Sequence, residues 1–116
     1  MTLDARALVA IILKEPGFEE IVSTLAGDEN PRVPATALAE AGMILSARAD
    51  TLAELRLQIL IDQLHLTVVP FTNQHWRGAI RSYEVAAKAK DAVRPRLGQC
   101  LSEAVAAKLG SAVIRR

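Results

Sequence analysis

Short segments rich in β-branched and apolar residues alternate with longer helical segments along this chain, and that alternation limits the possible fold most strongly. The segments 1–4, 66–71 and 111–115 have the composition of strands, and the segment 32–34 is a fourth, weaker candidate. Helical patterns lie between them, at about 7–13, 17–26, 36–48, from 51 onward, 72–90 and 97–109. This order predicts an α/β sandwich in which helices flank a mostly parallel, short-stranded sheet.

The ends of the helices carry recognisable signals. Thr51 and Glu54 have the spacing of a capping box, so we expect a helix to begin at Thr51. Thr72 is expected to cap the following helix, which would then run to about Lys90. Gly110 follows the last helical pattern and predicts its end.

Composition bounds the size and class of the protein. A chain of 116 residues with 51% hydrophobic residues is long and apolar enough for one core, so we expect a single domain over residues 1–116. Aromatic residues make up only 3%, which argues against an all-β fold. The formal net charge is +1, so any attraction to nucleic acid has to come from a local cluster of basic residues.

The sequence also indicates where the protein resides. Cys100 is the sole cysteine and cannot form an internal disulfide. The first residues lack the basic stretch and apolar run of a signal peptide, and charges or prolines interrupt every apolar run before it reaches membrane-spanning length. These features predict a cytoplasmic protein without a membrane partner.

Three polar residues stand alone in otherwise apolar segments, namely Asp4, Glu40 and Gln99. A buried carboxylate is costly unless it has a counter-charge, several donors or a metal ion. Asp4 follows the first strand, and ligand sites of parallel α/β sheets lie beyond the carboxyl ends of the strands. Two interpretations remain open. The residues converge on a site, or Asp4 pairs with Arg6 or caps a helix while Glu40 pairs with Arg48 or another cation.

Several motifs resemble those of the PIN-domain ribonucleases, especially the VapC toxins of bacterial toxin–antitoxin pairs. The residues that carry the resemblance are Leu3 to Ile11 with Glu15-Pro16, then Ala39 to Arg48, Val68 to Phe71, and Leu97-Gly98-Gln99-Cys100. Each motif is weak alone, but their order and spacing together are specific. The resemblance implies a PIN-like three-layer sandwich and an endoribonuclease that uses Mg²⁺ or Mn²⁺.

The resemblance also implies roles for individual residues. Asp4 matches the first metal-binding acid and Glu40 the second, while the third catalytic position, usually Asp, is Gln99. Arg6 stands where a Ser or Thr is usual, and a fourth acid and a final strand would lie beyond Arg116. A glutamine carbonyl ligates a hard cation without neutralising its charge. We therefore expect weak metal binding and impaired cleavage, or else an inactive module that binds an antitoxin or RNA.

Further expectations concern the partners. A basic segment before the last helix predicts contacts from Arg94 and Arg96, together with Arg6, to an RNA backbone, although a charged loop is more often simply solvated. Trp76 and Tyr83 lie seven residues apart, a spacing that favours packing in the core or between subunits over base stacking. The resemblance implies a homodimer and a cognate antitoxin protein laid across the second and third helices.

Overall fold

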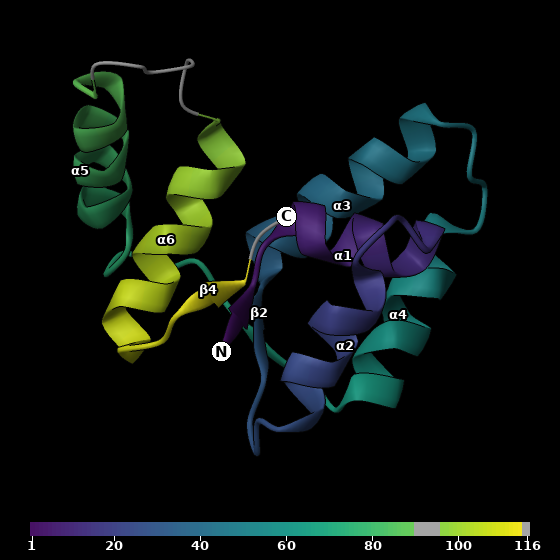
Figure 1. Ribbon diagram of the computed structural model, residues 1–116. Coiled ribbons are helices and arrows are strands. Elements are labelled where there is room, and N and C mark those ends of the chain that lie inside the picture. The colour runs from purple at the N-terminus through teal and green to yellow at the C-terminus, as the bar shows by residue number, and fades with distance from the viewer. Residues whose placement is uncertain (90–95, 115–116) are drawn as a thin grey trace.

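The computed structural model describes residues 1–89 and 96–114, and four parallel strands form its centre (Figure 1). The strands are β1 (Thr2–Leu3), β2 (Arg32–Pro34), β3 (Thr67–Val69) and β4 (Val113–Ile114), in the spatial order β3-β2-β1-β4. Thr2 is in register with Arg32 on one side and with Val113 on the other. All three pairings are parallel, which confirms the predicted type of sheet.

Six helices, all within the described residues, surround this sheet. They are α1 (Ala5–Leu13), α2 (Phe18–Ala26), α3 (Ala35–Ala47), α4 (Ala53–Leu64), α5 (Trp76–Ala87) and α6 (Leu97–Leu109). In Figure 1, α5 and α6 lie on one side of the sheet and α1, α2 and α4 on the other, while α3 contacts α1, α4 and α6. The predicted α/β sandwich is therefore confirmed. Within the described residues, no helix combines the length and the apolarity that crossing a bilayer would require.

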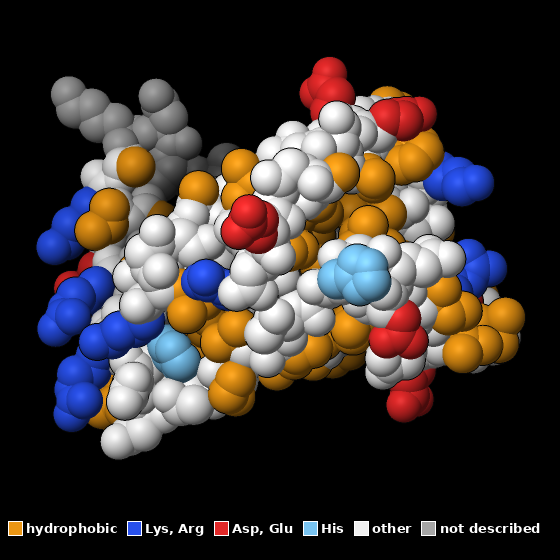
Figure 2. All heavy atoms as spheres, turned by 90° about the horizontal axis from the view of Figure 1, so that it is seen from below, with side chains coloured by type: hydrophobic (Ala, Val, Ile, Leu, Met, Phe, Trp, Pro, Cys, Tyr) orange, Lys and Arg blue, Asp and Glu red, His pale blue; other side chains and the backbone are white. Residues whose placement is uncertain are grey.

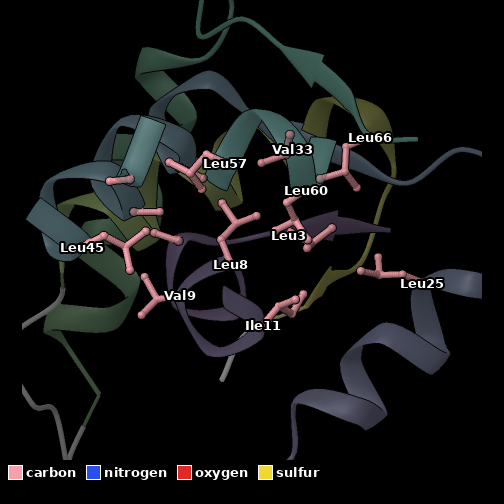
Figure 3. Close-up of a cluster of buried hydrophobic side chains, with 14 residues drawn as sticks. Leu3, Leu8, Val9, Ile11, Leu25, Val33, Leu45, Leu57, Leu60 and Leu66 are labelled. Carbon is pink, nitrogen blue, oxygen red and sulfur yellow. The ribbon is translucent and has the colours of Figure 1, made fainter. Parts of the chain in front are cut away.

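The main core lies between β1, β2 and the helices α1 to α4 (Figure 3). Leu3, Leu8, Val33 and Leu45 are fully buried there. Burying a side chain of this size contributes about 1.5–3 kcal/mol relative to leaving it exposed. Small alanines on α1 and α3 let these helices pack closely. Aliphatic side chains thus fill the core, as the low aromatic content predicts.

The predicted start of α4 was wrong. The helix begins at Ala53, and its N-cap residue, Leu52, makes no side-chain capping bond. The residue that organises this end is Asp50, whose Oδ1 accepts a 2.9 Å hydrogen bond from the Leu52 amide and whose Oδ2 lies 3.5 Å from Arg56 Nε. The Asp50 carboxylate takes the place expected for the Thr51 hydroxyl, because it both accepts the hydrogen bond of the turn and pairs with Arg56 on the helix.

The predicted start of α5 was also wrong, for a similar reason. Thr72 lies in a turn before the helix, where its Oγ1 accepts a bond from the Gln74 amide and its own amide donates to His75 Nδ1 over 2.8 Å. The helix then begins at Trp76 and ends at Ala87, before the predicted Lys90, which lies outside the described residues. By contrast, α6 spans 97–109 and ends at Gly110, as the sequence predicts.

Candidate active site

The topology brings Asp4, Glu40 and Gln99 to the same edge of the sheet. β1 and β2 are parallel neighbours, and α1 and α3 start directly after them, so Asp4 and the first turns of α3 lie at the carboxyl edge. α6 leads into the parallel strand β4, so its first turn, which holds Gln99, also lies at that edge. Ligand sites of parallel α/β sheets form at this edge.

Asp4 is buried and serves as the N-cap of α1. Its residue is 3% exposed, and its Oδ1 accepts a 2.9 Å hydrogen bond from the Ala7 amide. A carboxylate at a helix N-terminus is stabilised by the unpaired amides and by the helix dipole. The capping interpretation of Asp4 is therefore confirmed.

Glu40 extends from α3 onto the first turn of α6. Its half-buried carboxylate lies directly against the Cα of Gly98, so closely that a Cβ added at Gly98 would overlap both carboxylate oxygens. The absence of a side chain at position 98 is what creates room for this acid. The Glu40 carboxylate therefore lies at the first turn of α6, next in sequence to Gln99.

Gln99 is held by polar side chains of its own helix. Its Oε1 accepts a hydrogen bond from the Arg96 guanidinium over 3.4 Å, and its Nε2 donates to Glu103 Oε1 over 3.2 Å. The side chain therefore links the cation at the N-cap of α6, Arg96, to the Glu103 carboxylate one turn further along the helix. The carbonyl oxygen, which is the part of glutamine able to ligate a metal ion, already interacts with a positive charge.

The donors at this edge suit a hard divalent cation only in part. Carboxylate oxygens of Asp4 and Glu40 are appropriate ligands, and Mg²⁺ is commonly held by one or two carboxylates together with water. Yet no group of three or more His, Cys, Asp or Glu side chains among the described residues is arranged to hold a metal ion. The described part of this edge therefore offers two carboxylates and no third acid grouped with them.

A basic hollow adjoins these residues. Arg6, Val9, Glu15, Arg48 and Arg96 line a volume of about 390 Å³. Arg48 Nη1 lies 3.8 Å from Glu15 Oε2, so this arginine pairs with Glu15 and not with Glu40. Arg6 and Arg96, both predicted to contact RNA, thus line one hollow, while Arg94 lies outside the described residues. Sequence reasoning did not pair Glu15 with Arg48, because their separation along the chain gives no local signal.

The family model of the PIN domain matches residues 1–116. This chain belongs to the PIN-domain family. Two curated relatives are the VapC ribonuclease Mb2004c of Mycobacterium bovis and the ribonuclease VapC36 of Mycobacterium tuberculosis. Each is 28% identical to this chain over 107 residues, an alignment that covers 91% of this chain and 77% of the relative.

Two crystal structures share the PIN fold. VapC20 of Mycobacterium tuberculosis, described as a toxin that cleaves the sarcin-ricin loop, superposes with a TM-score of 0.71 at 13% identity over 99% of this chain and 88% of the other. VapBC2 of Rickettsia felis, bound to a DNA fragment from its promoter, superposes with a TM-score of 0.71 at 16% identity over 97% of this chain and 83% of the other. At these identities the superpositions confirm the fold.

The PIN domain also exposes two apolar hollows. One, of about 530 Å³, lies between α3 and α4 and is lined mainly by apolar side chains, among them Met43, which is 67% exposed. This hollow includes α3, one of the two helices across which the sequence analysis expects the antitoxin, whereas the apolar side chains of α2, Ile21, Val22 and Leu25, pack against the core. The other, of about 320 Å³, lies between α5 and α6.

Trp76 and Tyr83 belong to the second hollow. They are 42% and 44% exposed and line it together with Ile80 and Leu97, so packing in the core is excluded for both. Cys100 lies at the inner wall of this hollow and is buried. Burial, assisted by the nearby Glu103 carboxylate, raises the pKa of the Cys100 thiol, which therefore stays protonated and unreactive near neutral pH.

Proposed function

We propose that this PIN domain is a VapC-like endoribonuclease that hydrolyses RNA phosphodiester bonds with Mg²⁺ or Mn²⁺ and has reduced activity. The observation that carries the proposal is the contact of the Glu40 carboxylate with Gly98, beside Gln99 and at the sheet edge where Asp4 follows β1. The ribonuclease names of the two curated relatives support the choice of reaction.

In this proposal each residue of the edge has a distinct role. Asp4 and Glu40 would hold the divalent ion, and Gln99 would orient a ligand or water through its amide. When bound, such an ion supplies Lewis-acid activation of a water molecule and of the phosphodiester. Arg6 and Arg96 would bind the RNA phosphates from the adjoining hollow, joined by Arg94 from the preceding segment.

The reduced activity follows from charge. With glutamine at position 99, Asp4 and Glu40 supply the acidic ligands, while the Arg96 guanidinium and the Glu103 carboxylate both hydrogen-bond Gln99 and offset one another in charge. Attraction for a divalent cation falls when one carboxylate ligand is replaced by a neutral amide. Activity should therefore require a higher concentration of metal ion in this chain than in the variant Gln99→Asp.

A cleavage assay tests the proposed activity. Labelled RNA should be cut slowly in the presence of Mn²⁺ or Mg²⁺ and not in the presence of EDTA. Glu40→Gln, which keeps the shape of the side chain but removes its charge, should lower cleavage by at least about tenfold, the equivalent of about 1.4 kcal/mol in the barrier. Cleavage that is equal in the wild type and in Glu40→Gln would contradict the proposed site.

Restoring the acid tests the proposed cause of the impairment. The double variant Gln99→Asp/Arg6→Ser adds a negative charge and removes a positive one beside the proposed site of the divalent ion. Its Mg²⁺ affinity, measured by calorimetry, should therefore rise several-fold. Gln63→Asp, on the exposed surface of α4, serves as the control for added charge elsewhere. An unchanged affinity in the double variant would show that Gln99 and Arg6 do not limit metal binding.

A second candidate function is a catalytically silent PIN domain that binds an antitoxin or RNA without cutting it. The hydrogen bonds of Gln99 to Arg96 and Glu103 favour it, because they engage the third donor within α6 itself. The two functions share the same fold and partners. Absence of cleavage under all metal conditions, with RNA binding retained, would favour the silent domain.

We further propose a cytoplasmic protein with two kinds of protein contact. An amphipathic helix of the cognate antitoxin would occupy the hollow between α3 and α4, where apolar side chains on facing helices suit helix-in-groove binding. A second copy of the chain would cover the apolar surface of α5 and α6, whose exposed tryptophan and tyrosine are residue types enriched at interfaces.

A further inference from the structure

A second basic groove lies between the start of α5 and the end of α6, away from the acidic edge. It has a volume of about 640 Å³ and is lined by Asn73, Gln74, Arg77, Gly78, Arg81, Ala104, Ala107 and Lys108. None of the described residues that line it is acidic, and its lining shares no residue with the hollow that holds Arg6 and Arg96. Figure 2 shows Lys and Arg side chains gathered on the side of the molecule formed by α5 and α6.

Close packing of the two helices forms the floor of the groove. A Cβ placed on Gly78 would lie 3.5 Å from Ala104 Cβ, which is ordinary contact, and Ala104 is 3% exposed. Small residues therefore line the bottom, and the long basic side chains stand at the rim. A groove of this form admits a narrow polymer backbone between cationic walls.

The three cations come from facing walls. Arg77 and Arg81 are four residues apart on α5 and so lie on one face, about 5–6 Å apart at their Cβ atoms, and Lys108 lies across the groove on α6. Of the ion pairs between described residues, none involves these three side chains. In the hollow beside the acidic edge, by contrast, Glu15 pairs with Arg48 and offsets part of the positive charge.

One of these cations is oriented in advance. The Arg77 guanidinium carbon lies 4.2 Å from the centroid of the Trp76 ring, a cation–π contact. The indole Nε1 donates to Asn73 Oδ1 over 3.2 Å, which fixes the ring at the groove's end. A guanidinium held in this way loses less conformational entropy on binding an anion.

We propose that this groove binds the phosphodiester backbone of RNA at a position outside the cleavage site. Guanidinium groups bind phosphate oxygens in bidentate fashion, and a lining with three cations and no carboxylate favours a polyanion. From Gln99 to Lys108 the helix rises about 14 Å, so one RNA of modest length reaches both places. The identity of the polyanion rests on the proposed ribonuclease function, while the binding itself requires no cleavage.

The salt dependence of RNA binding tests this groove separately from catalysis. A labelled single-stranded RNA of 20 nucleotides, about the length of small test substrates, is titrated in EDTA by fluorescence anisotropy at several salt concentrations. Arg77→Gln/Arg81→Gln should weaken RNA binding about tenfold. It should also reduce the slope of log affinity against log salt by about 1.4, because each of the two lost phosphate contacts accounts for about 0.7. Lys108→Gln, on the other helix, should reduce the slope by about 0.7.

The charge-matched control is Lys14→Gln/Arg56→Gln, which removes two exposed cations from α4 and the end of α1. Equal losses in the two double variants, or no loss in either, would overturn the proposal. So would a polyglutamate peptide of equal charge that binds more tightly than the RNA, since it would identify an acidic protein segment as the ligand. Because no metal ion is present, failure of cleavage leaves the result of this titration unaffected.

Discussion

Gly98 is the residue on which the candidate site depends most directly. The Glu40 carboxylate occupies the space that any larger side chain at position 98 would need. Gly98→Ala should therefore displace the carboxylate, and because a flexible side-chain end is what must move, the cost to folding should be small. Alanine also favours a helix over glycine by up to about 1 kcal/mol. We expect unchanged or slightly higher thermal stability and a several-fold loss of Mg²⁺ affinity in calorimetry.

The matched control for this variant is Gly42→Ala. Gly42 lies within α3, and a Cβ added there would meet Leu57 Cδ1 at an ordinary 3.6 Å. The variant Gly42→Ala should raise helix propensity without moving Glu40, so its Mg²⁺ affinity should stay at the wild-type value. Equal metal affinity in Gly98→Ala and in the wild type would mean that Glu40 does not hold the ion.

At the residue scale, the sequence predicts what lies within one element and misses what separate elements bring together. Helix capping by Asp4, one of the alternatives that the sequence left open, is a local feature, because its partner Ala7 is three residues away. The pairing of Arg48 with Glu15 joins α3's C-terminus to the end of α1 and depends on how these helices pack. The contact between Glu40 and Gly98 likewise depends on how α3 and α6 cross. A glycine in the first turn of a helix was the sequence signal that another group approaches the backbone there.

At the scale of elements, the start of α4 shows how local chemistry decides a boundary. Asp50 binds the Leu52 amide and lies beside Arg56, whereas Thr51 makes no capping bond to α4. We expect Asp50→Ala to lower the free energy of unfolding by about 1 kcal/mol, the typical value of one such hydrogen bond. Thr51→Ala should be nearly neutral. Denaturant unfolding of both variants measures the difference.

A larger loss in Thr51→Ala than in Asp50→Ala would contradict this account and support the capping box. The error in the prediction arose because two adjacent residues both favour N-terminal positions, and sequence spacing alone does not rank them. The order and type of all ten elements were nevertheless predictable, since apolar periodicity and β-branched runs act over whole segments. The boundaries of α6 were predictable because Gly110 adopts the left-handed conformation that ends the helix.

At the scale of the whole molecule, the sheet separates two exposed apolar surfaces. The hollow between α3 and α4 and the hollow between α5 and α6 involve helices on different sides of the sheet (Figure 1). Because β4 pairs with β1 and is last in the strand order, it forms one edge of the sheet within the described residues. Strand edges and apolar surfaces are both features that partners cover.

Two charge insertions distinguish the roles proposed for these surfaces. Ile80 on α5 lines the second hollow and is 51% exposed, and Met43 on α3 lines the first and is 67% exposed, so Glu at either position should leave folding nearly unchanged. If a second copy of the chain covers α5 and α6, Ile80→Glu places two like charges in a desolvated interface and should convert a dimer into a monomer. Met43→Glu should leave the dimer intact. Light scattering after size exclusion measures both masses, and a dimer that persists in Ile80→Glu but is lost in Met43→Glu would place the self-association at α3 and α4 instead.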